Sequence, residues 1–273
     1  MKKLTIITIC YNEPNLEKTC ESIINQTWQD FEWVVIDGGS NAETQAVWNK
    51  YKYRIDKFVS EKDNGLYNAM NKGILLATGE YLNFMNAGDS FYDKYVLENI
   101  FKDKSYTADV LYGNYVYFSK KKKKNTIGKA PKKLSDIFWI ITTLNHQSTF
   151  IKKNLFQKYG LYDEQYKIAA DYDGFLRFYK KNAIFQYIDR IIAFFDTNGL
   201  SSSSSKSRNH DFDTIKGKYF SKEEIQQCIQ EYDRKKHSFL ERIFSLKKSH
   251  DRKFKILTIL NFCIKIPCKK EKQ

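Results

Sequence analysis

The stretch GEYLNFMNAGDS, residues 79–90, holds an apolar run that ends abruptly at one acidic residue, Asp89. Residues 80–85 have the composition of a buried strand, whereas Ala87 and Gly88 are small residues typical of a turn. A plain turn at the end of a strand would explain this pattern. A site for a metal ion and a phosphate at the mouth of a sheet would also explain it, and the neighbouring segments decide between the two.

Three earlier segments repeat the strand-like pattern, and segments with helical spacing separate them. The strand-like runs are LTIITIC (4–10), FEWVVID (31–37) and IDKFVSE (55–61). The helical stretches are Leu16 to Ile24, a segment that ends at Tyr51, and Leu66 to Ala77. This alternation is typical of a parallel sheet with crossover helices. The first 90 residues therefore predict an α/β fold.

Polar side chains follow each predicted strand, at the edge where a parallel sheet binds its ligands. They are Tyr11 and Glu13 after the first strand, Asp37 and Ser40 at the second, Asp63 and Asn64 after the third, and Asn86 and Asp89 after the fourth. Because the carboxyl ends of parallel strands share one edge, we expect these residues to converge. In this setting a ligand role for Asp37 and Asp89 is favoured over simple turns.

The pattern changes after residue 105. Strands are expected at 109–118, 145–152 and 184–196, and an amphipathic helix at 169–181. The five lysines 120–124 are expected to form a solvated hairpin turn, with a role in binding an acceptor phosphate as the alternative. The five serines 201–205 are expected to form a flexible loop. Beyond them the chain is predicted to be helical and basic to its end.

Composition restricts the class of protein. The 273 residues suffice for one large domain, or for one domain with an appendage. Five cysteines without metal-like spacing predict free thiols in a reducing compartment. The apolar run after Lys3 stops at Asn12 without a cleavage site, which favours a first strand over a signal peptide. No segment reaches the roughly 18 apolar residues of a transmembrane helix, so we predict a cytoplasmic protein.

The net charge of +14 is concentrated in the tail. From Tyr232 to Gln273 there are 13 Lys and Arg against 4 Asp and Glu. Between Phe254 and Ile266 large apolar residues lie among lysines, which is typical of a helix in an anionic membrane interface. A helix packed on the rest of the protein is the alternative, and a basic tail can also bind nucleic acid.

Four segments, taken in order and with their spacing, resemble glycosyltransferase family 2, the inverting type with the GT-A fold. They are ITICYN (7–12), QTWQDFEWVVIDGGS (26–40), SEKDNGLYNAMNKGILLATGEYLNFMNAGD (60–89) and HQSTFIKKNLFQKYGLYDEQYKIAADYDGFLR (146–177). The similarity is closest to the branch that makes bacterial capsule, lipopolysaccharide and exopolysaccharide. The tail after residue 210 lies outside it.

The resemblance implies a fold class and a division of the chain. Residues 1–210 would form an α/β, Rossmann-like GT-A domain with a mostly parallel sheet and flanking helices. Within it, residues 1–105 would be the nucleotide-sugar half and residues 106–210 the acceptor half. Residues 211–273 would be a basic helical C-terminal extension that associates with a membrane.

The resemblance also implies a divalent metal ion. Asp89 matches the family's metal-binding aspartate, whereas Asn86 and Gly88 stand where other members have acids. The diphosphate that leaves a sugar nucleotide develops negative charge, which must be neutralised. Mg²⁺ or Mn²⁺ does this while keeping several waters and needing few carboxylates, so one acid can suffice. Gly88 would let the phosphates approach the backbone closely.

By the same resemblance, Asp37 would accept a hydrogen bond from a ring N–H of the base, which suits uracil and a UDP donor. Tyr11 would stack on the base, with core packing equally open. The other donor-binding candidates are Thr8, Glu13, Ser40, Asp63, Asn68, Lys72, Asn86, Ala87 and Gly88. The loop 198–205 could close over the diphosphate.

Asp171 aligns with the family's catalytic aspartate and would deprotonate the acceptor hydroxyl. It opens a helix, whose dipole favours a carboxylate. Asp173 and Arg177 are four residues apart and predict a structural ion pair. His146 would hydrogen-bond the acceptor or the leaving phosphate, and a purely structural histidine is equally open.

These features predict an inverting, metal-dependent glycosyltransferase that moves a sugar from a nucleotide diphosphate, UDP by preference, to a hydroxyl of a lipid-linked or growing surface-polysaccharide acceptor. It would be peripheral on the inner face of the bacterial plasma membrane, without a nucleic-acid partner. A nucleotidyltransferase is an alternative, but its Gly-rich basic loop is missing at CYNEPN (10–15). A non-catalytic protein that binds nucleic acid through its tail is another, and its affinity would fall steeply with salt.

Overall fold

The computed structural model describes residues 2–119, 123–197, 205–248, 254–259 and 262–267. The contacts between residues divide the chain into two compact units. The larger unit comprises residues 1–135 and 142–219, and the smaller unit comprises residues 136–141 and 220–273. Every residue predicted to belong to the site lies in the larger unit.

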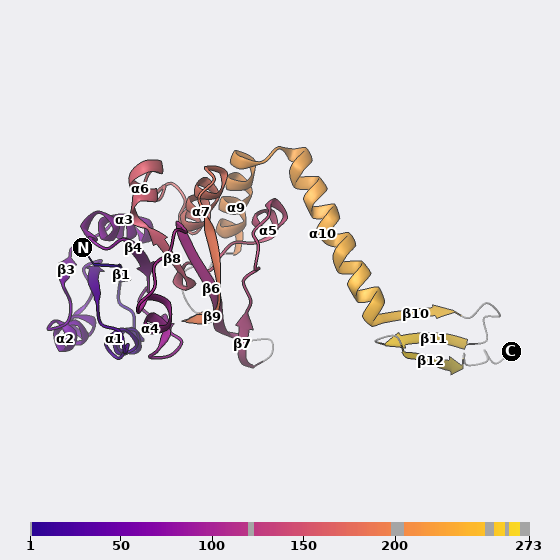
Figure 1. Ribbon diagram of the computed structural model, residues 1–273, viewed down its shortest axis with the longest axis horizontal. Helices are drawn as coiled ribbons and strands as arrows, with labels where there is room; N and C mark the ends of the chain where they lie inside the picture. Colours follow the sequence, from indigo (N-terminus) through magenta and orange to yellow (C-terminus); the bar gives the residue numbers. More distant parts are fainter. Residues whose placement is uncertain (1, 120–122, 198–204, 249–253, 260–261, 268–273) are drawn as a thin grey trace. The chain divides into compact units, whose positions relative to one another are not determined.

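The first half of the larger unit is the predicted parallel sheet (Figure 1). Its strands are β1 (Leu4–Cys10), β2 (Phe31–Asp37), β3 (Lys57–Ser60) and β4 (Tyr81–Phe84), in the order β3-β2-β1-β4. The helices between them are α1 (Leu16–Ile24), α2 (Ala42–Tyr51) and α3 (Leu66–Leu76). Each helix returns the chain to the start of the next strand, so all four carboxyl ends lie at one edge, as predicted.

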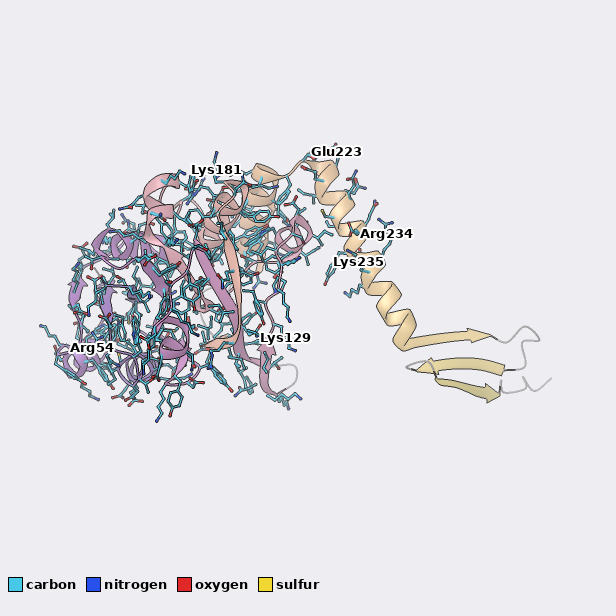
Figure 2. The ribbon with its side chains drawn as sticks, viewed as in Figure 1. Arg54, Lys129, Lys181, Glu223, Arg234 and Lys235 are labelled. Atoms are coloured by element: carbon cyan, nitrogen blue, oxygen red, sulfur yellow. The ribbon has the colours of Figure 1, made fainter. Side chains whose placement is uncertain are left out.

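The central strands are buried on both faces. Every residue of β1 and β2 is buried, as expected for β-branched runs in a parallel sheet covered by helices. Helix α3 lies directly on β1, because a Cβ on Gly73 would collide with the side chain of Ile7. At the amino end of β2, Arg54 (Figure 2) pairs with Asp56 at 3.1 Å and lies 4.2 Å from the centre of the Phe31 ring.

The sheet continues with strands of mixed direction. They are β8 (Thr149–Lys152), antiparallel to β4 and to β6 (Val110–Ser119), then β9 (Phe185–Phe195), parallel to β6, and β5 (Ser90–Phe91), antiparallel to β9. Strand β7 (Lys124–Gly128) pairs with β6 as a hairpin. The hairpin predicted at the lysine run is therefore confirmed, although residues 120–122 lie outside the described residues.

Short helices complete the second half. They are α4 (Val96–Phe101), the 3₁₀ turn η1 (His146–Ser148), α6 (Lys153–Tyr159), α7 (Ala170–Lys180) and α9 (Ser205–Tyr219). The buried carboxylate of Asp173 joins α7 to α9, since it accepts hydrogen bonds from Arg177 (2.9 Å), Lys218 (2.8 Å) and Tyr219 (3.0 Å). The predicted ion pair of Asp173 and Arg177 is thus confirmed. The loop predicted for the serines falls mostly on residues 201–204, outside the described residues; at Ser205 the prediction is wrong, because this residue begins α9.

The smaller unit contains helices and a separate sheet. Its elements are α5 (Asp136–Ile141), α10 (Lys222–Ile243), β10 (Phe244–Lys248), β11 (Phe254–Ile259) and β12 (Phe262–Pro267), with the three strands antiparallel. Along α10 the charged residues Glu223, Arg234 and Lys235 are exposed (Figure 2).

The prediction of helix to the end of the chain is correct as far as Ile243 and wrong for the three strands beyond it. The physical reason is composition, because the phenylalanine and isoleucine residues of FKILTI and FCIKIP favour strands over helices. Within the described part of the chain, no helix is long and apolar enough to cross a membrane.

Candidate active site

The loops that follow β1 and β2 are tied together by hydrogen bonds. The backbone N–H of Asn12 donates to Ser40 Oγ (2.9 Å), and Asn12 Oδ1 accepts from the Asn41 N–H (2.7 Å). Asn12 adopts a positive φ of 51°, a conformation that asparagine tolerates. Next to it, the side chain of Tyr11 is 68 % exposed, so the core-packing interpretation of Tyr11 is wrong.

Asp37, at the end of β2, is fully buried and surrounded by protein donors. Its Oδ2 accepts from the Ser40 N–H (3.0 Å), Gln45 Nε2 (2.7 Å) and Ser60 Oγ (2.6 Å). Burial alone would raise the pKa of Asp37, but the hydrogen bonds from Ser40, Ser60 and Trp48 outweigh it, so the pKa is lowered. Asp37 therefore holds its own loop together in the charged form.

A second acid, Asp63, lies beside Gly38 in the same loop region. Asp63 Oδ2 is 2.6 Å from the point that a Cβ on Gly38 would occupy, and Tyr11 Cδ2 is 3.4 Å from the same point. Any side chain at residue 38 would therefore collide with the Asp63 carboxylate. The missing side chain of Gly38 is what allows Asp63 to reach the loop beside Tyr11.

Asp89 follows β4 and is 5 % exposed. Its Oδ1 accepts from the Asp196 N–H (2.8 Å) and its Oδ2 from Gln147 Nε2 (2.5 Å). Burial raises the pKa of Asp89 to about 6, against the opposing effect of these two hydrogen bonds. The turn is fixed by Thr19, whose Oγ1 accepts from the Gly88 N–H (2.9 Å) and donates to the Asp89 carbonyl (2.6 Å). Gly88 has a φ of +98°, which favours glycine.

Asp171, in the first turn of α7, is held from three sides. His146 Nδ1 lies 2.9 Å from its Oδ2, and the Tyr172 N–H donates to its Oδ1 (2.9 Å). The Tyr67 hydroxyl lies 3.0 Å from the same Oδ1 and 2.7 Å from the Ile168 carbonyl, so the two oxygens share its one hydrogen. Burial and the charge of Asp171 raise the pKa of Tyr67 well above its ordinary value, so Tyr67 remains a donor. On its other side, His146 Nε2 contacts Asn86 Nδ2 at 3.2 Å. The structure therefore brings Asn86, His146 and Asp171 together.

Two buried amide oxygens in this network have no hydrogen-bond partner among the described residues: Asn86 Oδ1 and Gln147 Oε1. The described residues contain no group of three His, Cys, Asp or Glu side chains that could hold a metal ion. However, Mg²⁺ and Mn²⁺ accept carboxylate and amide oxygens and retain waters. The carboxylate of Asp89 and the unpartnered oxygen of Asn86 are oxygen donors of this kind.

The remaining predicted residues form two groups: some lie beside the Asp89 turn, and others contact protein partners. The Glu13 carboxyl carbon lies 3.4 Å from a Cβ placed on Gly88, which puts Glu13 beside the Asp89 turn, where Ala87 also lies. Three others contact protein partners instead. Thr8 is buried and accepts from Trp33 Nε1 (3.0 Å), Asn68 Nδ2 donates to Glu164 (3.0 Å), and Lys72 pairs with Glu61 (2.6 Å).

Sequence reasoning missed two side chains that touch the predicted acids, Gln147 and Tyr67. Gln147 directly follows His146 in HQSTF, and this adjacency was the available signal. Neighbouring residues of a 3₁₀ turn point in different directions, so one short segment can reach two acids. Tyr67 carried no such signal, because its contact with Asp171 spans 104 positions of the sequence.

Comparison with known proteins identifies the class. The family model "Glycosyl transferase family 2" matches residues 5–187. A PGL/p-HBAD biosynthesis glycosyltransferase of Mycobacterium tuberculosis is 31 % identical over 192 residues, covering 67 % of this chain and 72 % of the relative. An uncharacterized glycosyltransferase of Rickettsia prowazekii is 28 % identical, covering 67 % and 60 %. The chain belongs to glycosyltransferase family 2, and it is an enzyme of the transferase class.

Solved structures show the same fold. S. aureus TarS in complex with UDP superposes with a TM-score of 0.62 at 18 % identity, covering 88 % of this chain and 73 % of TarS. A mannosyltransferase of Pyrobaculum calidifontis, solved with GDP-Man and Mn²⁺, superposes with a TM-score of 0.56 at 15 % identity, covering 80 % and 61 %. The GT-A fold with flanking helices predicted from the resemblance is confirmed. The sheet is mixed rather than mostly parallel, because the strands after β4 pair mainly in antiparallel fashion.

Proposed function

We propose that this protein is an inverting glycosyltransferase that moves a sugar from a UDP-sugar to a hydroxyl of a lipid-linked or polysaccharide acceptor. The observation that carries the proposal is the network that joins Asp89, after β4, to Asp171, in α7, through His146 and Gln147. It provides one acid at the strand end where a diphosphate would bind, and a second acid that can take a proton. TarS, which shares the fold, was also solved with UDP-GlcNAc, which supports a nucleotide-sugar donor.

Asp63, rather than Asp37, is our candidate for reading the base. Asp37 is fully buried and accepts from four protein groups, whereas Asp63 is partly exposed and lies beside Gly38, next to the exposed Tyr11. A carboxylate accepts the N3–H of uracil but finds no hydrogen on N3 of cytosine. Tyr11 has an exposed ring on which the base can stack. This arrangement favours UDP over CDP.

Asp89 and Asn86 would hold a divalent metal ion, which would neutralise the charge that develops on the leaving diphosphate. Glu13 and Gly88 would form the adjacent wall. Gly88 carries no side chain, so the phosphates can approach its backbone. The bound ion would also relieve the cost of burying the Asp89 charge.

Asp171 would act as the base. The acceptor oxygen attacks the anomeric carbon while its proton passes to Asp171 Oδ2. The bond between the anomeric carbon and the diphosphate oxygen breaks, and its electron pair leaves with the diphosphate. Attack from the face opposite the leaving group inverts the configuration. Asp171 Oδ2 accepts one hydrogen bond, from His146, and retains a lone pair for the proton.

The positive charge of the tail supports a proposal for the place of the reaction and for the acceptor. The tail carries most of the surplus of Lys and Arg, and anionic lipids attract such a segment. We therefore place the enzyme at the inner face of a bacterial plasma membrane, where it would build capsule, lipopolysaccharide or a similar surface glycan on a lipid-linked acceptor.

Calorimetric titration with UDP, CDP, GDP and dTDP, with and without Mn²⁺, tests the donor assignment. We expect UDP to bind in the presence of Mn²⁺ and Asp89→Ala to abolish this binding. Asp63→Ala should weaken UDP binding about 10- to 100-fold, the worth of a charge-assisted hydrogen bond. Asp30→Ala, at the amino end of β2, is the matched control. A wild-type protein that binds none of these nucleotides would contradict the proposal.

A further inference from the structure

The 3₁₀ turn η1 presents two neighbouring side chains to two different acids. His146 Nδ1 contacts Asp171 Oδ2 at 2.9 Å, and Gln147 Nε2 donates to Asp89 Oδ2 at 2.5 Å. The turn is held by its own bonds, since the Asn145 carbonyl accepts from the Ser148 N–H (3.1 Å) and from Ser148 Oγ (3.0 Å). One rigid turn therefore contacts both the candidate metal ligand and the candidate base.

We propose that His146 and Gln147 are a pair of positioning residues, with His146 orienting the base Asp171 and Gln147 orienting the metal ligand Asp89. This inference rests on the proposed function and deepens it. Neither side chain is required to touch the reacting atoms. The adjacency of the two residues in one turn fixes the base relative to the donor, which is the alignment that in-line displacement needs.

The hydrogen bonds of His146 favour positioning over proton transfer. Asn86 Nδ2 can only donate, so His146 Nε2 must accept, and the imidazole hydrogen then sits on Nδ1 and is donated to Asp171. The lone pair of Nε2 is engaged by Asn86 and is not open to an acceptor hydroxyl. Asp171, with its remaining lone pair, is the group left to take the proton.

Gln147 is buried and its backbone is held by a neighbouring strand. It is 2 % exposed, and its neighbour β4 fixes its backbone, because Asn83 Nδ2 donates to the Gln147 carbonyl (3.0 Å). The amide N–H of Gln147 is one of two donors to the Asp89 carboxylate, the other being the Asp196 backbone. Without this N–H, the carboxylate would keep a single protein donor and lose its fixed orientation.

If His146 positions Asp171, one of two matched His146 variants should retain activity. An asparagine nitrogen sits on Cγ, as Nδ1 does, whereas a glutamine nitrogen sits one bond further out, as Nε2 does. We expect His146→Asn to keep kcat within about 3-fold of wild type and His146→Gln to lower kcat about 10- to 100-fold. The assay is UDP release from UDP-Glc, UDP-Gal, UDP-GlcNAc and UDP-GalNAc, with water in place of the acceptor.

If Gln147 orients Asp89, its substitution should weaken UDP binding rather than turnover. We expect Gln147→Met, which keeps the length but removes the N–H, to weaken Mn²⁺-dependent UDP binding about 10-fold or more. Gln157→Met on the exposed face of α6 is the control. Because Gln147 is buried, Gln147→Leu is a second variant, and it should weaken binding as Gln147→Met does, since neither side chain has a donor. The His146 variants should weaken Mn²⁺-dependent UDP binding less than Gln147→Met does, because His146 does not contact Asp89.

A spectroscopic signature completes the test without a substrate. In ¹⁵N-histidine NMR at pH 8, the wild-type His146 should show hydrogen on Nδ1, and Asp171→Asn should shift this tautomer balance. Equal loss of kcat in His146→Asn and His146→Gln would overturn the positioning role and make His146 the proton acceptor. Wild-type binding in both Gln147→Met and Gln147→Leu would overturn the positioning role of Gln147. A wild-type protein that binds UDP yet releases it from no UDP-sugar would contradict the proposed function instead, and the NMR and binding results would still decide this inference.

Discussion

At the residue scale, Asp89 is a buried acid whose charge costs folding stability. A carboxylate that is 5 % exposed and has two protein donors keeps its charge at a cost, which is why burial raises its pKa to about 6. The folded protein therefore binds this proton more tightly than the unfolded chain does. Folding stability must fall as pH rises from the unfolded pKa near 4, and the loss is complete above about 6.

Removal of this charge should stabilise the metal-free protein. We expect Asp89→Asn to raise the free energy of unfolding by about 2–3 kcal/mol at pH 8, the equivalent of the pKa shift, and to change it little at pH 4. Gln147 can turn its unpartnered Oε1 toward the new amide, which then has an acceptor. Urea unfolding in EDTA at the two pH values measures the effect. A gain of the same size at both would show that packing, not charge, is responsible.

At the element scale, the sequence predicted the elements whose own residues show helical spacing or a strand-like apolar run. The continuous runs of β1 and β2 and the spacing of α1 and α3 are intrinsic to their segments, and these elements match their predicted bounds within a residue or two. The two-residue strand β5 and the turn η1 carry no such period. They form because a neighbour offers hydrogen-bonding partners, and this is visible only once the fold has formed.

For the candidate site, the sequence predicted which residues lie near one another but not where their side chains point. Parallel topology placed the polar residues at one edge, so the neighbourhood of Asp89 and Glu13 follows from the sequence. The direction of a side chain does not follow from topology. Asp37 ends β2 and Asp63 follows β3, but only the structure shows that the first turns into its own loop while the second lies beside Gly38.

The junction of α7 and α9 gives a prediction at this scale. The buried carboxylate of Asp173 lies against two cations, Arg177 and Lys218. Asp173→Asn would leave both without their counter-charge, and we expect a loss of about 3 kcal/mol in the free energy of unfolding. The control is Asp213→Asn on α9, because Asp213 is largely exposed and pairs with Lys216; its loss should be below about 1 kcal/mol. Equal losses in urea unfolding would show that burial of the pair contributes nothing.

At the scale of the whole molecule, charge and chemistry are separated along the chain. The candidate site lies in residues 1–219, whereas the surplus of positive charge is concentrated after Tyr232. A basic segment of this kind has two kinds of partner, anionic lipid and nucleic acid, and both interactions weaken with salt. Salt dependence alone therefore does not distinguish a membrane-bound transferase from a nucleic-acid-binding protein.

Binding to vesicles does distinguish them. We expect the full chain to sediment with phosphatidylglycerol vesicles and not with phosphatidylcholine vesicles. Changing Lys247, Lys248, Lys255 and Lys265 to Gln should weaken this binding at least 100-fold, because each lysine near an anionic surface contributes about 1 kcal/mol. The control changes four exposed lysines of the larger unit, Lys52, Lys132, Lys133 and Lys158, to Gln. If both sets weaken binding equally, net charge rather than the tail directs the protein to the membrane. If the protein prefers single-stranded RNA to the vesicles, the lipid-linked acceptor loses its physical basis, whereas the donor site after β4 is unaffected.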